Sequence, residues 1–339
     1  MFFSDVRKRP VVYILPLVFL LTGIALGFFF RDGRIDKDAN RAFYVKREGA
    51  YRFINPLLEC DTDQNVMRNR ELRPFKDTVE NVLANSVRSG GVTSAAIYFR
   101  ELNDGLWFSI GDTARFTPAS MRKVPLMIAI FKMSERDKGL LSRKVPVRLK
   151  QDYNAYQNIK PSKILDPGRE YTVADLVSRM IVYSDNNAFT LLTGIVDPRE
   201  LDREYELLSI RDPNDAQPDD YLSITTYASF FRILYNATYL TRDLSDVALE
   251  FLSRTEFKAG LAEGVPPAIA VAHKFGEHSD EKTGEKQLHD CGIIYYPRHP
   301  YLLCIMTRGT NFETLDDSIA SVSRIIFAEV DAQHRKEHR

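Results

Sequence analysis

The sequence predicts an α+β fold, with an antiparallel five-stranded sheet flanked by terminal helices and an inserted all-helical subdomain, plus an N-terminal transmembrane helix. Three observations support this prediction. Apolar runs typical of strands occur around residues 94–110 and 268–307. Residues between about 120 and 255 show helical spacing of apolar side chains and no convincing strand. Residues 11–30 form a 20-residue run without a charge, and such a helix would span a bilayer core of about 30 Å.

The uncharged run indicates an uncleaved signal anchor. Arg7, Lys8 and Arg9 precede it, and no small-residue cleavage site follows it. The expected organisation is a cytoplasmic N-terminus, an anchor, a tether with lead-in, one globular domain and a polar tail, at residues 1–10, 11–30, 31–70, 71–332 and 333–339.

The composition gives no sign of a nucleic-acid partner or of a metal ion. Among 339 residues the formal net charge is zero, which gives no reason to expect a nucleic-acid partner. The three cysteines are Cys60, Cys291 and Cys304, and no CxxC or His/Cys spacing suggests a metal ion. We therefore expect no metal, and we expect no cofactor. The sequence says nothing about oligomers, so a monomer is only the default.

The first part of the domain predicts a helix followed by a hairpin. Residues 72–88 have helical spacing and end before Gly90-Gly91. Residues 94–102 form a dense apolar run, Asn103-Asp104-Gly105 is a hairpin turn signal, and residues 106–110 form the returning strand.

The next helix carries the first chemical motif. Thr117 is expected to cap it and Pro118 to occupy its first position, which places Ser120 in the first turn. Free N–H groups and the helix dipole favour developing negative charge there. Lys123 follows on the same face, and the apolar residues after it indicate burial, which would lower the lysine pKa and let the amine take the hydroxyl proton. The alternative is a capped core helix whose Ser120 and Lys123 face water.

The helical block contains a second motif. A capping-box-like start at Thr172-Val173-Ala174-Asp175 begins a helix that ends at Tyr183. Ser184-Asp185-Asn186 interrupts it, and helical spacing resumes at residues 188–196. Ser184 could shuttle a proton and Asn186 could hold a substrate amide, although a simple helix-capping turn explains the tripeptide equally well. A loop at residues 212–220 and helices at 229–239 and 244–252 complete the block.

The last part of the chain returns to strands. Strands are expected at residues 268–275, 288–296 and 301–307, with a charged loop at 276–286 and a final helix at 315–330. Cys291 and Cys304 lie symmetrically about the turn between the last two strands. They could therefore face each other across a hairpin, or be two buried thiols.

The third motif is Lys274-Phe275-Gly276, at the end of a strand. Lys274 could present its charge to a substrate carboxylate, and Gly276 would let a substrate backbone approach closely. The backbone N–H groups of Ser120 and Glu277 could together form an oxyanion hole. The alternative is an edge-strand lysine on the solvent face.

In this order the three motifs resemble the class A β-lactamase family and its relatives among the penicillin-binding proteins. The resemblance covers residues 75–330 and includes the segments 168–176 and 301–307. It implies a β-lactamase/transpeptidase-like fold and an acyl-enzyme on Ser120. It further implies Lys123 as base or proton relay, Ser184 as proton donor to the leaving nitrogen, and substrate binding by Asn186 and Lys274.

Two departures from the family pattern limit what the resemblance implies. A literal Lys282-Thr283-Gly284 exists, but its charged neighbours indicate an exposed loop, so we prefer Lys274. Phe275 then replaces the family's hydroxyl residue. No E-x-x-L-N supplies the glutamate that activates the deacylating water, so the deacylation base is unknown, with Asp212, Asp219 and Asp220 as weak candidates.

Three functions therefore remain open at the level of sequence. The chain could be a membrane-anchored β-lactamase, a cell-wall D-alanyl peptidase or penicillin-binding hydrolase with slow or no β-lactam turnover, or an inactive membrane-anchored binding module. The expected partners are a β-lactam or a peptidoglycan stem peptide, and the membrane through residues 11–30. Because such substrates lie outside the cytoplasm, we expect a single-pass protein of the cell membrane with an extracytoplasmic domain.

Overall fold

The computed structural model describes residues 45–49, 51–60, 73–88, 91–103, 105–207 and 220–335. The anchor predicted at residues 11–30 lies outside these ranges, as do Asp212, Asp219 and residues 336–339 of the tail. None of the described helices combines the length and apolarity that a membrane crossing requires.

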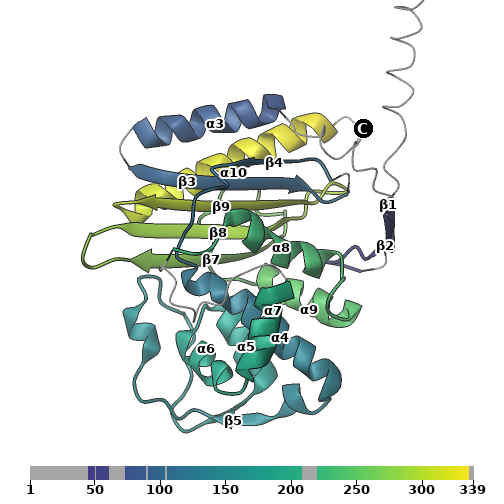
Figure 1. Ribbon diagram of the computed structural model, residues 1–339, viewed down its shortest axis with the longest axis vertical. Coiled ribbons are helices and arrows are strands. Elements are labelled where there is room, and N and C mark those ends of the chain that lie inside the picture. Colours follow the sequence, from purple (N-terminus) through teal and green to yellow (C-terminus); the bar gives the residue numbers. More distant parts are fainter. Residues whose placement is uncertain are drawn as a thin grey trace, which may run out of the picture.

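An antiparallel five-stranded sheet organises the domain, and it confirms the predicted sheet built from both ends of the globular part. Its order is β4-β3-β9-β8-β7 (Figure 1). The strands are β3 Val92–Glu101, β4 Trp107–Ile110, β7 Val271–Ser279, β8 Lys286–Ile294 and β9 Tyr301–Gly309. β7 is an edge strand, so part of its backbone has no neighbouring strand to pair with.

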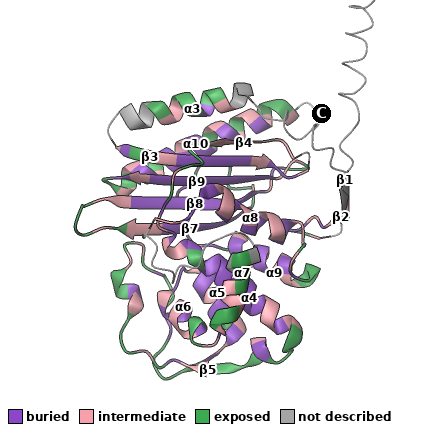
Figure 2. Ribbon diagram, viewed as in Figure 1, coloured by how far each residue is buried: buried purple, intermediate pink, exposed green. Residues whose placement is uncertain are grey.

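The two terminal helices pack together against one face of this sheet. They are α3 Arg73–Arg88 and α10 Phe312–His334 (Figure 1). Ile97 and Ile305 are cross-strand partners, and both join Ile319 and Ile326 of α10 in one apolar cluster. Figure 2 shows the central strands almost wholly buried and the outer face of α3 exposed. Burial of this apolar surface is the dominant stabilising contribution.

The helical subdomain lies beside β7 and in front of the other face of the sheet (Figure 1). Thr172 caps α5 and forms the predicted capping box with Asp175. The subdomain contains α4 Lys123–Arg136, α5 Val173–Val182, α6 Asn186–Thr193, α7 Pro198–Leu207, α8 Ile224–Tyr235 and α9 Arg242–Ser253, and the short turns η1 Ala119–Arg122, η2 Leu140–Ser142 and η3 Tyr153–Tyr156.

Two short two-stranded sheets were not predicted. β5 Lys144–Pro146 pairs with β6 Glu170–Thr172 inside the block that was expected to be purely helical. β1 Val45–Arg47 pairs with β2 Leu57–Cys60 in the expected tether. Strands of three or four residues carry too few side chains to show a period of two in the sequence.

The described part of the predicted tether and lead-in, residues 31–70, packs on the domain. Phe53 is only 4% exposed and belongs to the main core. The Arg47 guanidinium donates to Asn236 Oδ1 at 2.8 Å and to the Leu102 carbonyl at 2.8 Å. These contacts hold the segment against α8 and the end of β3.

β7 is longer than predicted, because Gly276–Ser279 continue the strand where a charged loop was expected. Their backbones pair with β8 through Ser279↔Lys286. The same register places Cys291 opposite Cys304, and the two are joined by a disulfide. Of the two alternatives for these cysteines, the structure shows the bonded one.

Candidate active site

A cleft of about 610 Å³ lies between the sheet edge and the helical subdomain. Ser120, Lys123, Asn186 and Glu277 line it, together with aromatic side chains that include Tyr153 and Tyr156. These residues come from η1, α4, α6, β7 and η3, so the fold gathers at one place residues from the first two motifs and Glu277, which directly follows the third.

Ser120 lies in η1, directly before α4, and the predicted helix cap is wrong. Pro118 is the N-cap of η1 and makes no side-chain capping bond. The Thr117 hydroxyl instead donates to Asp220 Oδ1 at 2.7 Å. Ala119 has a φ of 46°, a left-handed conformation that costs a non-glycine residue roughly 1–3 kcal/mol. The strain occurs at the residue that precedes the serine.

The Lys123 ammonium nitrogen lies in contact with the Ser120 hydroxyl. Nζ is 3.0 Å from Ser120 Oγ, 2.6 Å from the Ser184 carbonyl oxygen and 2.7 Å from Asn186 Oδ1. The last two atoms can only accept, so a neutral amine directs both of its N–H groups to them. Its lone pair is then left for a hydroxyl hydrogen. This geometry suits proton transfer from Ser120 to Lys123.

Burial lowers the pKa of Lys123 well below that of an ordinary lysine, and the positive charge of Lys274 lowers it further. The side chain is 2% exposed, as expected for a lysine at the start of a buried helix. The neutral form, which can act as a base, is therefore accessible at a pH far below the usual lysine range.

Ser184 lies between two lysines. Its Oγ is 3.0 Å from Lys123 Nζ and 3.0 Å from Lys274 Nζ. Its φ is 56°, again left-handed, and its carbonyl also accepts from Gln157 Nε2 at 2.8 Å. Only 1% of the residue is exposed, so Ser184 lies just behind the cleft surface.

A group of amides and carboxylates holds this turn, and sequence reasoning missed it. Asn154 of η3 accepts from the Asn186 backbone N–H at 2.7 Å and donates to Asp185 Oδ1 at 2.9 Å. Asp185 also caps α6 through the backbone N–H groups of Asn187 and Ala188. Asn154 lies about thirty residues before the motif in the sequence, and no local spacing connects the two. The Asp of Ser184-Asp185-Asn186 thus positions its neighbours.

Lys274 lies on β7 with its ammonium wholly buried, and Lys282 is exposed in the turn between β7 and β8. Lys274 Nζ lies 4.0 Å from the centroid of the Phe275 ring, which stacks on Phe257. The pKa of Lys274 is lowered to about 7 by burial, against the opposing charges of Asp290 and Glu277. Lys274 does not line the cleft, and its ammonium instead donates to Ser184 Oγ. The expected direct contact of Lys274 with a substrate is therefore not seen in this structure.

Gly276 allows a close contact, but within the protein itself. A Cβ there would lie 2.8 Å from Met121 Cγ and 3.1 Å from the Pro118 carbonyl. β7 thus packs directly on η1, which brings the backbones of Glu277 and Ser120 to the same part of the cleft. Their pairing as an oxyanion hole stays a prediction.

The Glu277 carboxylate connects β7 to the segment after η3. Its Oε1 accepts from the backbone N–H groups of Asn158 and Ile159, both at 2.8 Å. Glu277, Gln157 and Asn158 all line the cleft, so this contact closes one side of it.

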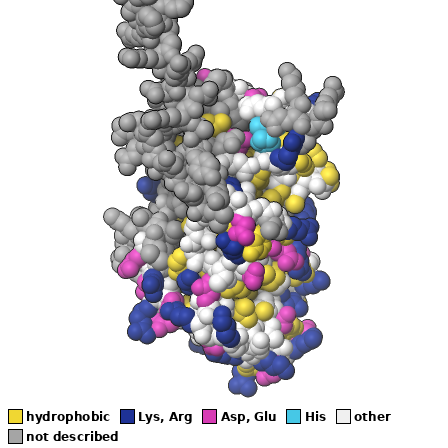
Figure 3. Space-filling view, turned by 90° about the vertical axis from the view of Figure 1, so that its right-hand side faces the viewer, with side chains coloured by type: hydrophobic (Ala, Val, Ile, Leu, Met, Phe, Trp, Pro, Cys, Tyr) yellow, Lys and Arg dark blue, Asp and Glu magenta, His cyan; other side chains and the backbone are white. Residues whose placement is uncertain are grey.

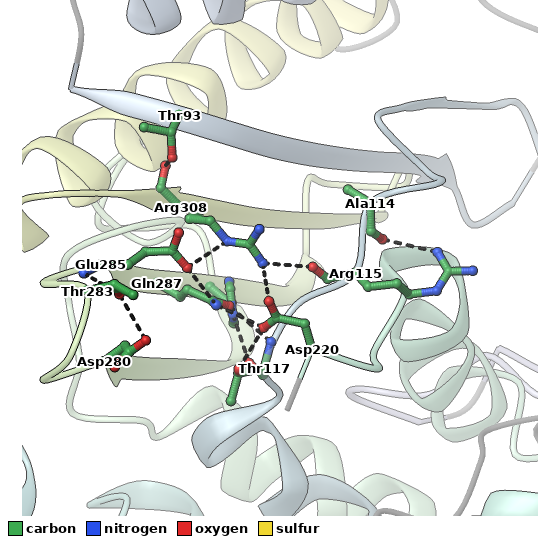
Figure 4. A network of polar contacts seen from close by, with 11 residues as sticks. Thr93, Ala114, Arg115, Thr117, Asp220, Asp280, Thr283, Glu285, Gln287 and Arg308 are labelled. Carbon is green, nitrogen blue, oxygen red and sulfur yellow. Dashed lines mark hydrogen bonds and ion pairs between the residues drawn. The ribbon is translucent and has the colours of Figure 1, made fainter. Parts of the chain in front are cut away.

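Asp220 is committed to a separate polar network (Figure 4). Its Oδ1 accepts from Thr117 and from Gln287 Nε2, and its Oδ2 pairs with Arg308 at 2.6 Å. Partial burial opposes ionisation, but the hydrogen bonds from Gln287 and Thr117 and the Arg308 charge outweigh it and hold the pKa of the Asp220 carboxyl below its ordinary value. An ion-paired aspartate of low pKa is a poor base, and this geometry argues against Asp220 as the deacylation base. Asp220 instead braces the start of η1.

Lys274→Ala should slow acylation by a penicillin at least tenfold, whereas Lys282→Ala should change it less than twofold. Lys274 donates to Ser184 Oγ from a buried position, and Lys282 makes no contact with the cleft in the part of the chain that the structure describes. The measurement is the second-order rate of labelling by a fluorescent penicillin. Equal effects of the two substitutions would show that the third motif is wrongly placed.

Comparison with protein families identifies one match over most of the chain. The model of the "Beta-lactamase enzyme family" matches residues 74–330. The chain is 26% identical to Beta-lactamase CTX-M-97 of Escherichia coli over 280 residues, which are 74% of this chain and 92% of that protein. It is 28% identical to Beta-lactamase CTX-M-4 of Salmonella typhimurium over 231 residues, 62% of this chain and 76% of that protein.

Solved structures share the fold. The protein PBP-A has a TM-score of 0.63 at 20% identity, over 78% of this chain and 98% of its own. A variant of PBP-A, solved as an acyl-enzyme complex with penicillin G, has a TM-score of 0.62 at 20% identity, with the same coverage. A β-lactamase from Chitinophaga pinensis has a TM-score of 0.64 at 18% identity, over 76% of this chain and 99% of its own.

Proposed function

Because this chain belongs to the β-lactamase enzyme family, we propose that it is a membrane-anchored serine hydrolase that opens β-lactams through an acyl-enzyme on Ser120. One observation carries the proposal. The Lys123 nitrogen lies 3.0 Å from both Ser120 Oγ and Ser184 Oγ. Its two partners that can only accept, the Ser184 carbonyl and Asn186 Oδ1, leave its lone pair for a hydroxyl. A neutral buried amine in that position activates a serine without a histidine.

Acylation begins when Lys123 takes the Ser120 hydroxyl proton and Oγ attacks the lactam carbonyl carbon. The oxyanion that forms receives hydrogen bonds from the backbone N–H groups of Ser120 and Glu277. When the lactam C–N bond breaks, the Ser184 hydroxyl donates its proton to the ring nitrogen. The Lys123 ammonium, 3.0 Å from Ser184 Oγ, then restores that proton, so the products are an ester on Ser120 and a free amine.

Lys274 and Asn186 complete the proposed site. Protonated Lys274 donates to Ser184 Oγ and places a positive charge behind the cleft, where it favours a substrate carboxylate. Asn186 Nδ2 is 3.4 Å from the Tyr153 carbonyl, which orients the amide so that its oxygen accepts from Lys123. A substrate amide would compete for this Nδ2 group.

Release of the ester distinguishes the proposal from its alternative, a cell-wall D-alanyl peptidase or penicillin-binding hydrolase that turns β-lactams over slowly. One observation favours this second function. Glu277 is the only carboxylate among the described residues that line the cleft. Its Oε1 already accepts two backbone N–H groups and its Oε2 is buried, so neither oxygen is open to a water that would release the ester. One of the similar structures is itself a penicillin G acyl-enzyme.

The proposal also places the domain outside the cytoplasm, anchored by residues 11–30. The uncharged run at those positions supports anchoring. The Cys291–Cys304 disulfide supports an oxidising compartment, because disulfides are rare in the cytosol. Protease added to spheroplasts should digest the domain, and full protection of the domain would contradict this placement.

Hydrolysis of a chromogenic cephalosporin tests the activity directly. Hydrolysis with multiple turnovers that is lost in the Ser120→Ala variant supports the β-lactamase. A single stoichiometric burst supports the slow penicillin-binding hydrolase. Absence of both, with folded protein confirmed by circular dichroism, would leave only the inactive binding module.

Glu277→Ala should lower kcat/KM at least about tenfold, mainly by raising KM. Two hydrogen bonds to a charged acceptor, each contributing about 1.5–3 kcal/mol, hold the segment at Asn158 and Ile159 against β7. Glu277→Gln retains a carbonyl oxygen as acceptor and should keep most of the activity. Wild-type kinetics in the alanine variant would show that this connection does not shape the cleft.

A further inference from the structure

Three side chains with metal-binding groups meet at the end of the sheet away from the cleft. Glu101 ends β3, His299 lies in the turn between β8 and β9, and His334 ends α10. One carboxylate oxygen and one nitrogen from each imidazole all lie within 4.8 Å of one another. Figure 3 faces this end of the molecule and shows histidine atoms at the surface beside acidic and basic side chains.

The distances fit one small cation. Glu101 Oε1 is 3.0 Å from His334 Nε2 and 3.5 Å from His299 Nδ1. Two ligands bound to zinc at about 2.0–2.1 Å with tetrahedral angles lie roughly 3.3–3.5 Å apart. The two imidazole rings stack with centroids 3.6 Å apart and planes 14° from parallel. Because an imidazole nitrogen donates in the plane of its ring, one ring must turn out of this stack when both bind the same ion. Two imidazoles and one carboxylate are a ligand set that zinc and related divalent transition metals accept.

Burial at this place also suits an ion site. The Glu101 carboxylate is 8% exposed, and the imidazoles of His299 and His334 are 15% and 14% exposed. The ligands are thus largely shielded, while an edge stays open to water, which can enter with the ion and complete its coordination. These three residues are far apart in the sequence, so no local spacing could indicate them.

We propose that Glu101, His299 and His334 bind a divalent transition-metal ion, with zinc as the best-fitting example. The ion ties the end of α10 and the β8–β9 turn to the end of β3. The Leu102 carbonyl next to it accepts from Arg47, so the site stabilises the region where the lead-in packs. This departs from the expectation that the chain binds no metal. The competing explanation is a plain hydrogen bond between His334 and Glu101 that needs no ion.

Calorimetric titration of the untagged full-length chain with zinc chloride tests the proposal, with the zinc-induced shift in melting temperature as a second readout. We expect one zinc per chain and a higher melting temperature with zinc. Glu101→Gln and His334→Ala should each weaken zinc binding more than tenfold, because loss of a residue that only supports a ligand already costs about 10–100-fold. His278→Ala and Glu329→Gln are matched controls that should leave zinc affinity unchanged.

Two results would overturn the site. One is a folded wild-type chain that binds no zinc, and the other is Glu101→Gln binding zinc as tightly as wild type. Should Glu101→Gln or His334→Ala fail to fold, His299→Gln, which replaces the third ligand, gives the same comparison. Cobalt titration adds an independent readout, because the intensity of its visible bands reports the coordination number.

Discussion

Ser120→Ala should abolish covalent labelling by a fluorescent penicillin and leave the melting temperature within about 2 °C of wild type. Loss of a serine nucleophile costs roughly 10⁶-fold in a comparable hydrolase, so any residual reaction falls below detection. Ser120 is partly exposed and lines the cleft, so its hydroxyl contributes little to the packing of the core. The measurement is gel fluorescence after labelling, with thermal unfolding of the same samples.

The stability of this variant is as informative as its labelling. A melting temperature lowered by ten degrees would indicate a structural serine, and loss of labelling would then have a trivial cause. Undiminished labelling would mean that another residue carries the acyl group. Ser109, which lies on β4 away from the cleft, provides a matched serine-to-alanine control that should label like wild type.

Lys123→Met should slow acylation by about 10³-fold or more, because it removes the proposed base and fills the same space with an apolar side chain. Asn186 Oδ1 loses its Lys123 donor, and the Ser184 carbonyl keeps only the one from Gln157, so we also expect a stability loss of about 1–3 kcal/mol. Lys123→Arg separates charge from basicity, because a guanidinium stays protonated. Acylation of the arginine variant at more than a tenth of the wild-type rate would contradict the role of the lysine as base.

The pH profile of acylation gives the same assignment a second, independent check. Only neutral Lys123 accepts a proton, so the rate should rise with pH through the lowered pKa of Lys123, well below the ordinary lysine range. The pH dependence that comes from Lys274 has the opposite sign, since only the protonated form of Lys274 attracts a substrate carboxylate. Above about pH 7, binding of anionic β-lactams to the free enzyme should therefore weaken. A rate that rises only near pH 10 would show that Lys123 is not activated.

The sheet was predictable because its strands carry dense apolar runs. β9 is buried along nearly its whole length, and its apolar sequence shows this directly. β8 is equally buried but includes the polar residues Gln287, His289 and Asp290, and its predicted start at residue 288 came after the observed start at Lys286. The motif residues were predictable for a different reason. Ser120 and Lys123 are one helical turn apart, and Ser184 and Asn186 lie in one turn, so each pair is readable from local spacing.

Contacts between distant segments were not predictable. Thr117 is a residue type that often caps helices, but in the fold its hydroxyl donates a hydrogen bond to Asp220 instead. The strand β7 continues through polar residues because they pair with β8. The residue types of a segment do not show which other segment it will pair with. Asn154 supports Asn186 from about thirty residues away, and Phe275 supports Lys274 by ring contact, where the sequence indicated only a missing hydroxyl.

Mass spectrometry of the chain after incubation with a penicillin tests the central proposal most directly. We predict one adduct per chain of the mass of the intact β-lactam, located by digestion on the peptide that contains Ser120. Its decay after removal of free penicillin gives the deacylation rate, and hence decides between the two hydrolase functions. A folded chain that forms no adduct, or that carries the adduct on a residue other than Ser120, would contradict the mechanism.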